Sequence, residues 1–280
     1  MSTITANSKR VRRLIQPTAA VLITFFLLGV PFLIIIFTAG KDQGAALNPD
    51  LAPPETWHLL ENFATVLDEG NMVQALLGSL LVMVPSVVLV LVLGSLASWI
   101  LARRASRPMA ILYALAISGI VLPPAVVTIV LLLRQLGLAG TAIGMVAVYT
   151  GMYLSTVIFF VTGFIRTIPH ELEEAARMDG AGPLRVFWKV IVPLLTPTLA
   201  TASILICLYI WNDVFYALFV IGGRIDTLPL NLFDVASAGL YLQRWNAIFS
   251  YIILMSLPLL LVFIFLQRKI ISGITSGAVK

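Results

Sequence analysis

Long runs of apolar residues dominate the pattern along this chain. Six runs are long enough to cross a bilayer as helices, because a spanning helix needs about 20 mostly apolar residues. They are Leu14–Ala39, Gln74–Ala102, Met109–Leu133, Ala142–Ile165, Leu194–Ile221 and Ala247–Leu266. Between the first two runs, apolar residues recur at helical spacing over Leu59–Leu67 and predict a short amphipathic helix. The pattern predicts an all-α integral membrane protein with one transmembrane domain over residues 1–280.

The composition strengthens this interpretation. Hydrophobic residues make up 60% of the chain and charged residues 11%, whereas a soluble domain carries about 25% charged residues. Too few polar side chains remain to cover a soluble globule. The first run has a basic flank like that of a signal peptide, but it is too long, and Thr38-Ala39-Gly40 is a poor cleavage site. We therefore expect a multi-pass membrane protein that keeps its first span.

The positions of the basic residues predict the orientation. Lys and Arg accumulate on the cytoplasmic side of membrane proteins because their translocation is disfavoured. Both tails and the even-numbered loops together hold fourteen of the 18 Lys and Arg residues. Six spans with both termini in the cytoplasm are therefore predicted. The net charge of +5 follows from this topology, so we expect membrane lipid and no nucleic acid as a partner.

The loop between the fourth and fifth runs, residues 166–193, is the most charged part of the chain. Pro169 suits the first turn of a helix, and Glu173 and Arg177 are spaced for an i,i+4 ion pair. Gly180 stands where a left-handed glycine ends a helix. Pro183 then begins a second apolar stretch. The signals predict two short helices hinged at Gly180, at the cytoplasmic face of the membrane.

The first of these helices has a surface suited to a partner protein. Leu172, Ala175, Ala176 and Asp179 fall on one face by their spacing. Two small residues there leave room for close packing by a cytoplasmic protein. A loop that is merely solvated between two spans is the alternative, and it has no use for this arrangement.

The same residues resemble a known motif. "EEAARMDG" followed by "VIVP" is similar to the EAA motif of bacterial ABC importer permeases, which is Glu-Ala-Ala, three residues, Gly, nine residues and Ile-x-Leu-Pro. The matching positions are Glu174, Ala175, Ala176, Gly180, Val190, Val192 and Pro193. Valine replaces the usual Ile and Leu, which preserves the apolar character. The resemblance covers nearly the whole chain, because "WNDVFYALFVI" and "TLPLNL" look like the carbohydrate-importer branch, the MalG-type permeases.

The resemblance implies a six-helix MetI-like fold in a bacterial inner or plasma membrane. It implies that the chain forms half of a translocation pathway for a sugar or oligosaccharide, beside a companion permease subunit in a heterodimer. It also implies that two ABC ATPase subunits dock on the EAA loop, with Asp179 beside the motif residues at the contact. An extracytoplasmic sugar-binding protein would deliver the substrate.

Other function classes find little support. The phosphate-binding pattern G-x-x-x-x-G-K-[ST] does not occur, so ATP and magnesium are expected on a separate ATPase and no cofactor on this chain. No H-E-x-x-H pattern or second intramembrane acid suggests an enzyme or a metal site. An ion-coupled secondary transporter or a non-transporting scaffold remains the alternative. Secondary transporters usually carry several coupling acids near the midplane, whereas this chain has one.

That single acid is Asp213, which follows Trp211 and Asn212 in the fifth run. An intramembrane acid is by default a functional candidate, and these three residues could line a sugar pathway. Alternatively, Asn212 and Asp213 bridge helices or cap an interruption of the fifth span. The second interpretation is favoured.

Overall fold

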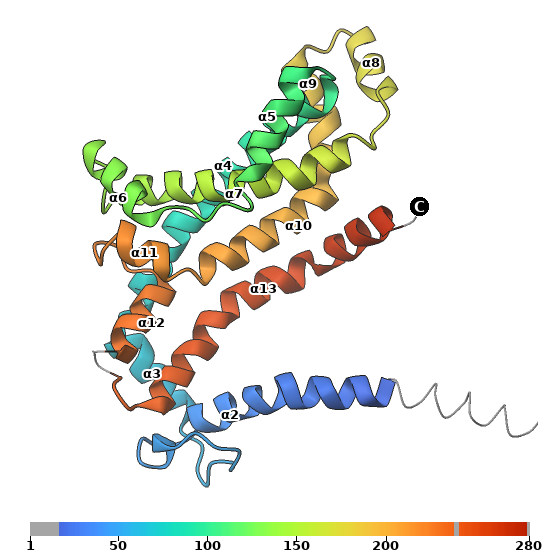
Figure 1. Ribbon diagram of the computed structural model, residues 1–280. Coiled ribbons are helices and arrows are strands. Elements are labelled where there is room, and N and C mark those ends of the chain that lie inside the picture. The colour runs from blue at the N-terminus through green and yellow to red at the C-terminus, as the bar shows by residue number, and fades with distance from the viewer. Residues whose placement is uncertain (1–16, 238–240, 279–280) are drawn as a thin grey trace, which may run out of the picture. The chain divides into compact units, whose positions relative to one another are not determined.

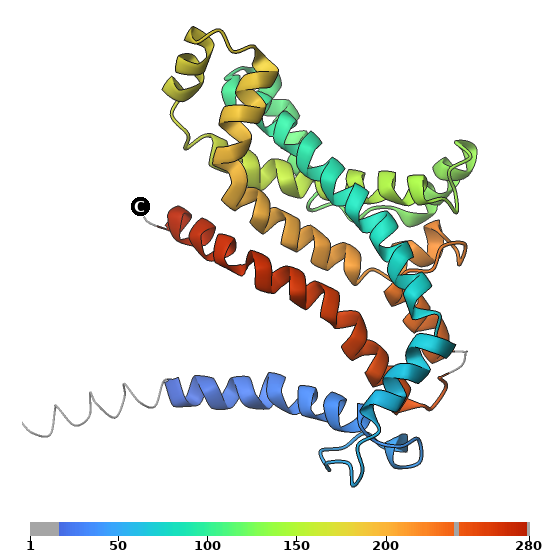
Figure 2. The ribbon, with the colours of Figure 1, turned by 180° about the vertical axis from the view of Figure 1, so that it is seen from behind.

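The computed structural model describes residues 17–237 and 241–278, with side chains to residue 265 (Figures 1 and 2). The basic N-terminal residues and the start of the first predicted span lie outside the described part. Helices and no strands make up the regular structure of the described residues, so the all-α prediction is confirmed. The first helical stretch is Pro17–Ala39, which contains the π-helical segment η1 (Phe25–Gly29) followed by α2 (Val30–Ala39). The other elements are η2 (Ala45–Leu47), α3 (Leu59–Glu69), α4 (Met72–Arg103), α5 (Arg107–Ser118), α6 (Val126–Gln135), α7 (Ala142–Ile165), α8 (Glu171–Met178), α9 (Pro183–Val186), η3 (Phe187–Ile191), α10 (Val192–Trp211), α11 (Phe215–Val220), α12 (Leu228–Ser237) and α13 (Trp245–Ala278).

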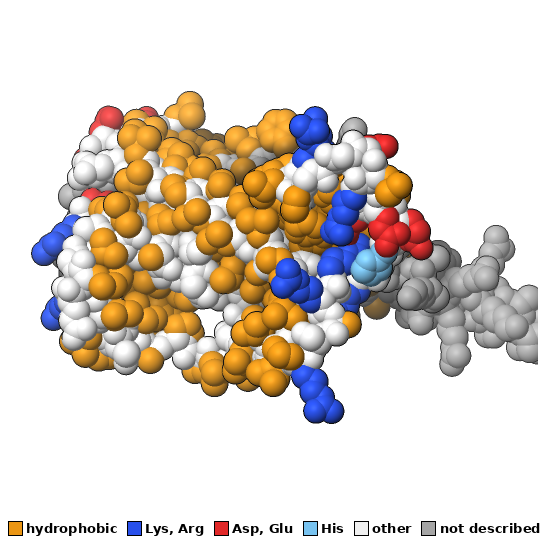
Figure 3. All heavy atoms as spheres, turned by 90° about the horizontal axis from the view of Figure 1, so that it is seen from above, with side chains coloured by type: hydrophobic (Ala, Val, Ile, Leu, Met, Phe, Trp, Pro, Cys, Tyr) orange, Lys and Arg blue, Asp and Glu red, His pale blue; other side chains and the backbone are white. Residues whose placement is uncertain are grey.

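Among the described residues, five helices are long and apolar enough to cross a membrane. They are Pro17–Ala39, Met72–Arg103, Ala142–Ile165, Pro183–Trp211 and Trp245–Phe265. Hydrophobic side chains cover the middle of the face shown in Figure 3, and charged side chains stand at its two ends. This banding fits a protein surrounded by lipid. The predicted orientation, with both termini in the cytoplasm, stays a prediction.

The third apolar run differs from the predicted single helix. In place of one helix over Met109–Leu133, the chain forms α5 and α6, of 12 and 10 residues. The segment between them contains Pro123 and Pro124, which cannot donate to a helical carbonyl and which push the preceding residue out of helical geometry. The predicted count of six spans therefore depends on α5 and α6 crossing the membrane together, and it stays a prediction.

The fifth apolar run also differs from its prediction, at both ends. Helix continues without a break from Pro183 through α9, η3 and α10 to Trp211, so the second short helix of the charged loop is the first part of a long one. Pro193 lies inside this helix and follows the π turn η3. A π turn relieves the clash between a proline ring and the carbonyl four residues earlier. At its other end the run is interrupted after Trp211, and α11 forms separately.

The chain divides into two compact units, Met1–Asn71 with Asp234–Ser256 and Met72–Phe233 with Leu257–Lys280. In the second unit, α4 packs along α7, and α10 packs against both (Figures 1 and 2). Gly94 allows this close approach, because a Cβ there would lie 2.6 Å from Cγ1 of Val157. Small residues have this role at many helix contacts in membranes, where packing stabilises the bundle.

In the first unit, Asn62 on α3 is the central polar residue. Its side chain is buried, and its amide donates to the carbonyls of Ala39 and Lys41, both at 2.8 Å. Its carbonyl oxygen accepts from Asn246 at 2.9 Å. The amphipathic helix predicted over Leu59–Leu67 is confirmed as α3, but Leu60 at its predicted apolar face is 81% exposed. Hydrogen bonds of Asn62 hold this helix in the unit.

Candidate functional site

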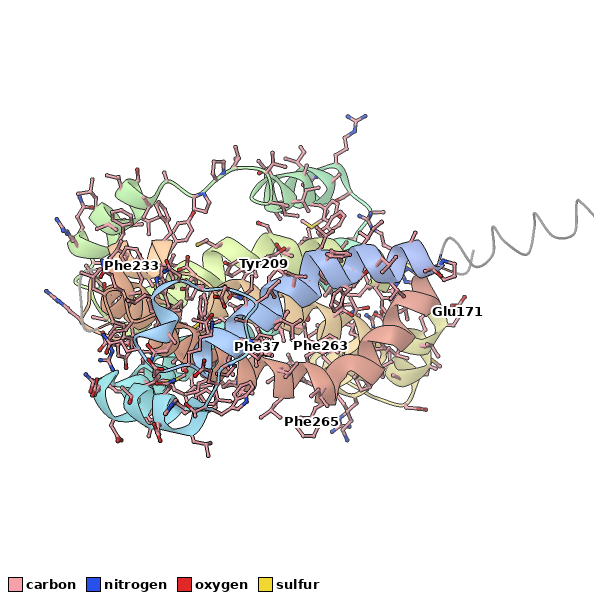
Figure 4. The ribbon with its side chains drawn as sticks, turned by 90° about the horizontal axis from the view of Figure 1, so that it is seen from below. Phe37, Glu171, Tyr209, Phe233, Phe263 and Phe265 are labelled. Atoms are coloured by element: carbon pink, nitrogen blue, oxygen red, sulfur yellow. The ribbon has the colours of Figure 1, made fainter. Side chains whose placement is uncertain are left out.

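Helix α8 and the turn after it form the core of the charged loop. Helix α8 begins at Glu171 (labelled in Figure 4), with Pro169 one residue before its N-cap rather than in its first turn. At the other end, the amide of Gly180 donates to the carbonyl of Arg177, and the amide of Ala181 donates to that of Ala176, both at 3.0 Å. This pair of bonds is a Schellman motif. Gly180 has φ +79°, so its predicted left-handed conformation is confirmed.

One carboxylate anchors α8 to the rest of the unit. The side chain of Glu173 is 4% exposed, although it lies in the most charged loop of the protein. Its Oε1 accepts from Nε of Arg103 at 2.6 Å, and its Oε2 accepts from the indole N–H of Trp99 at 3.1 Å. The predicted pair with Arg177 is also present, at 3.7 Å. The carboxylate is thus hydrogen-bonded on both oxygens.

Arg103 and Trp99 lie one turn apart near the end of α4, and together they contact both α8 and η3. Arg103 also donates to the carbonyl of Ile168 at 3.0 Å and lies 3.3 Å from Nε2 of His170, so it contacts three points of the segment that enters α8. The ring of Trp99 packs against Phe187, with centroids 5.7 Å apart, and Phe187 is fully buried in η3. The end of α4 therefore contacts α8 directly and the start of the long helix through Phe187.

Arg103 and Trp99 were not among the predicted site residues. The sequence shows Arg103 only as one base of a cytoplasmic loop, and its partner lies 70 residues away along the chain. Nothing in the spacing of residues joins the two. The only available signal was the pair of adjacent acids at Glu173 and Glu174, of which one is buried and one exposed.

The side of α8 away from Glu173 is open. Four residues there are exposed, and we call them the open face of α8: Leu172, Glu174, Ala175 and Met178. Two of them are large apolar side chains, with Met178 88% exposed. Ala176 is half-buried on the side of Glu173, so the structure separates the two alanines that were predicted to share one surface. Asp179 is exposed at the C-cap beside the open face.

The remaining motif residues lie on the long helix rather than on α8. Val190 is half-buried in η3, and Pro193 is exposed in the first turn of α10. Both residues therefore lie at the junction between the π turn and the first turn of α10. The motif thus combines an open helix, a left-handed turn and the start of a transmembrane helix.

Asp213 occupies the interruption between α10 and α11. Its Oδ2 accepts from the hydroxyl of Tyr149 on α7 at 2.7 Å and from the amide of Ala217 at 3.0 Å. Its Oδ1 accepts from the amide of Tyr216 at 3.2 Å. A carboxylate that accepts amide hydrogens at a helix start satisfies donors that otherwise lack partners. These contacts fit the interpretation of Asp213 as a cap and a bridge between helices.

The two residues before Asp213 complete the interruption. The side-chain amide of Asn212 donates to the carbonyl of Leu208 at 2.8 Å and so bonds to the end of α10. Trp211 is buried within the unit. Asn212 is nevertheless exposed, and a role of Trp211 or Asn212 in a sugar pathway stays a prediction. In the described part of the chain, no group of three His, Cys, Asp or Glu side chains could hold a metal ion.

The fold and the loop geometry agree with one family of transport proteins. The profile of the binding-protein-dependent transport system inner membrane component matches residues 91–276, well over half of the chain. The chain belongs to this family. The permease is thus a transmembrane subunit of an ATP-driven ABC importer in the inner membrane, a transport subunit and not an enzyme. It works in a transporter complex that includes an ATPase and a binding protein.

Curated relatives cover almost the whole permease. It is similar to the melibiose/raffinose/stachyose import permease protein MelC of Bacillus subtilis (strain 168), with 32% identity over 90% of this chain and 91% of that protein. It is also similar to the multiple sugar-binding transport system permease protein MsmG of Streptococcus mutans serotype c, with 30% identity over 90% of this chain and 91% of that protein.

A solved structure supports the fold. The permease matches a chain of a bacterial ABC transporter involved in the import of the acidic polysaccharide alginate, with a TM-score of 0.77. The match covers 92% of this chain and 97% of that chain, at 22% sequence identity. The ABC importer permease fold that the motif implied is therefore confirmed.

Proposed function

We propose that this permease forms half of the membrane pathway for a sugar or oligosaccharide. Two relatives, a melibiose/raffinose/stachyose import permease and a multiple sugar-binding transport system permease, support this substrate class. The resemblance of the stretches "WNDVFYALFVI" and "TLPLNL" to the carbohydrate-importer branch agrees with it. A companion permease subunit supplies the other half of the pathway in a heterodimer, and an extracytoplasmic binding protein delivers the sugar.

The open face of α8 is the proposed docking surface for an ABC ATPase. Two ATPase subunits hold the ATP and magnesium, one on this permease and one on its companion. Glu174 and Asp179 offer exposed carboxylates to basic groups, while Leu172 and Met178 offer apolar area. Ala175 lies between them and allows a partner to approach closely. Exposed apolar side chains beside polar ones are a frequent feature of protein contacts.

The contrast between Glu173 and Glu174 carries the proposal. Glu173 is buried and bonded to the end of α4, while Glu174 beside it is exposed on the open face. Helix α8 therefore has one side fixed to a transmembrane helix and the other side free for a partner. A movement of the ATPase would displace α8, and the Arg103–Glu173 pair would carry the displacement to α4. A solvated connecting loop has no need of a buried ion pair.

The test is a bulky substitution on the open face. Ala175→Trp places a large side chain between Leu172 and Met178 and should prevent docking. Ala175 is preferred to Ala176 because Ala176 is half-buried, so a change there would also disturb packing within the chain. Ala105→Trp is the matched control, because Ala105 is also an exposed alanine on the predicted cytoplasmic side and lies outside the motif.

Three quantities are measured for each variant: abundance in the membrane, co-purification of the ATPase, and uptake of melibiose, raffinose and stachyose into cells. Ala175→Trp should insert at normal abundance, lose the ATPase and lose uptake, while Ala105→Trp should match the unchanged protein. Normal ATPase co-purification and uptake with Ala175→Trp would exclude the docking surface. If the unchanged transporter retains its ATPase but takes up none of a broad sugar panel, the proposed substrate class is wrong.

A further inference from the structure

A cavity of about 370 Å³ lies within the second unit, beside the interruption of the third apolar run. It is lined by the segment Gly119–Pro124, by residues of α7 and by Tyr209 of α10. The volume falls within the range of about 300–1,000 Å³ that is usual for small-molecule sites. Pro123 and Pro124, which break the helix here, belong to this lining.

Two tyrosine rings form one wall of this cavity. Tyr153 on α7 and Tyr209 on α10 stack with their centroids 5.7 Å apart and their planes 15° from parallel. Tyr209, labelled in Figure 4, is 50% exposed, so part of its ring is free for another contact. A flat, exposed aromatic ring is the surface on which the C–H face of a pyranose ring packs.

Three hydroxyl groups at this cavity have no hydrogen-bond partner within the described residues: those of Tyr153, Thr156 and Tyr209. On the same helix, Tyr149 donates to Asp213 at 2.7 Å and Thr150 donates to the carbonyl of Val146 at 2.6 Å, whereas the buried hydroxyl of Thr162 also has no partner among the described residues. An unpaired hydroxyl that faces hydrocarbon is costly. The three groups at this cavity are therefore available to hydrogen-bond with water or with a polar ligand.

An adjacent cavity of about 400 Å³ provides a useful contrast. It shares Gly119, Leu122, Pro124 and Met152 with the first cavity, but its lining contains no hydroxyl side chain and is apolar, with Ile129, Leu132 and Leu133 from α6. Such a surface suits lipid tails or apolar packing. Of the two cavities, only the one with the tyrosine pair matches the alternation of C–H and hydroxyl groups on a sugar.

We propose that Tyr209, Tyr153 and Thr156 form a sugar-contact site in the membrane pathway of this permease. The exposed ring of Tyr209 stacks on one sugar ring, and the hydroxyls of Tyr153 and Thr156 exchange hydrogen bonds with the sugar hydroxyls. The site rests on the proposed function, since it takes sugar as the substrate. The ring of Tyr153 also packs against that of Tyr149, with ring centroids 6.1 Å apart, and the hydroxyl of Tyr149 donates to Asp213. Asp213 thereby positions the site without contacting the sugar.

The test compares Tyr209→Leu with Tyr209→Phe in the assembled transporter. Loss of the ring should lower the rate of sugar uptake about tenfold, from the usual strength of aromatic contacts and hydrogen bonds together. Loss of the hydroxyl alone should lower it about fivefold or less. Phe159→Leu is the matched control, because Phe159 is an exposed aromatic residue on α7 that does not line the cavity.

The measurements are uptake of melibiose, raffinose and stachyose and the stimulation of ATP hydrolysis by the binding protein. In Tyr209→Leu the relative rates for the three sugars should change, while the ATPase stays coupled and the transporter stays assembled. Tyr209→Phe keeps the packing and shows that any loss is not a folding defect. Uptake rates and sugar preference equal to those of Phe159→Leu would overturn the contact site and leave the proposed function intact. An unchanged transporter that carries no sugar overturns both.

Discussion

The Arg103–Glu173 pair should contribute strongly to the local stability of α8. Its side chains are 11% and 4% exposed, so screening by water is small. Removing one partner of a buried ion pair typically costs about 3–5 kcal/mol, because the other charge remains buried. Arg103→Met leaves the Glu173 carboxylate with only Trp99 and the more distant Arg177, so it should fall in that range. Glu173→Gln should cost less, about 1.5–3 kcal/mol, because the amide oxygen still accepts a hydrogen bond.

Hydrogen exchange of the segment 168–180 in the purified transporter measures this effect directly. A loss of about 3 kcal/mol increases exchange through local opening on the order of 100-fold. Arg104→Met is the matched control, because Arg104 is the exposed neighbour of Arg103 and should leave exchange unchanged. The double variant Arg103→Met with Glu173→Gln removes both charges and should cost clearly less than the two single variants added together.

The same variants should separate ATP hydrolysis from transport. If the pair carries movement from α8 to α4, Arg103→Met should still bind the ATPase through the open face but should use more ATP for each sugar imported. Unchanged exchange over the segment 168–180, or purely additive effects in the double variant, would refute the role of the ion pair. Increased exchange with unchanged ATP use per sugar would limit the pair to local stability.

Substitutions at three further positions test other parts of the protein. Gly180→Val should destabilise the turn after α8 by about 1–2 kcal/mol and reduce ATPase co-purification. Gly180→Asn should be nearly neutral, because asparagine tolerates φ +79°. Equal co-purification with the two variants would show that the left-handed turn is not needed for docking. Asp213→Asn should keep transport, while Asp213→Leu should lower the amount of folded protein; abundant but inactive protein in both cases would place Asp213 in the sugar pathway. The hydrogen bond from Lys41 holds the pKa of Asp50 below 3.8, so this pair stabilises the loop between α2 and α3 above that pH and loses its effect as the pH falls through the lowered pKa. As the pH falls below 3.8, the rate of pepsin digestion of this loop should rise more in the unchanged protein than in Asp50→Asn, which lacks the titrating carboxylate.

Local signals in the sequence predicted much of this structure. The positions of Gly180, Pro183 and the Glu173–Arg177 pair identified α8 and its turn, because helix caps and i,i+4 pairs depend on residues close together in the chain. The apolar run Ala142–Ile165 coincides with α7. Such features need no knowledge of the tertiary structure.

The remaining features depend on contacts between distant residues or on backbone geometry. Apolar content alone does not distinguish one helix from two, so the break at Pro123 and Pro124 was not predicted, although both prolines were visible. The burial of Glu173 depends on Arg103 and Trp99, more than 65 residues earlier. The separation of Ala175 from Ala176 follows from that burial, because it fixes which side of α8 faces the bundle.

Cross-linking of Ala175→Cys to the ATPase subunit tests the docking surface most directly. The background is Cys207→Ala, since Cys207 is the single cysteine of the chain. With a short thiol cross-linker and cysteines introduced on the ATPase surface, Ala175→Cys should form a cross-linked product in the assembled transporter, and Ala105→Cys should not. Equal cross-linking at both positions, or none at Ala175→Cys in a transporter that is active in sugar uptake, would contradict the docking of the ATPase on the open face of α8.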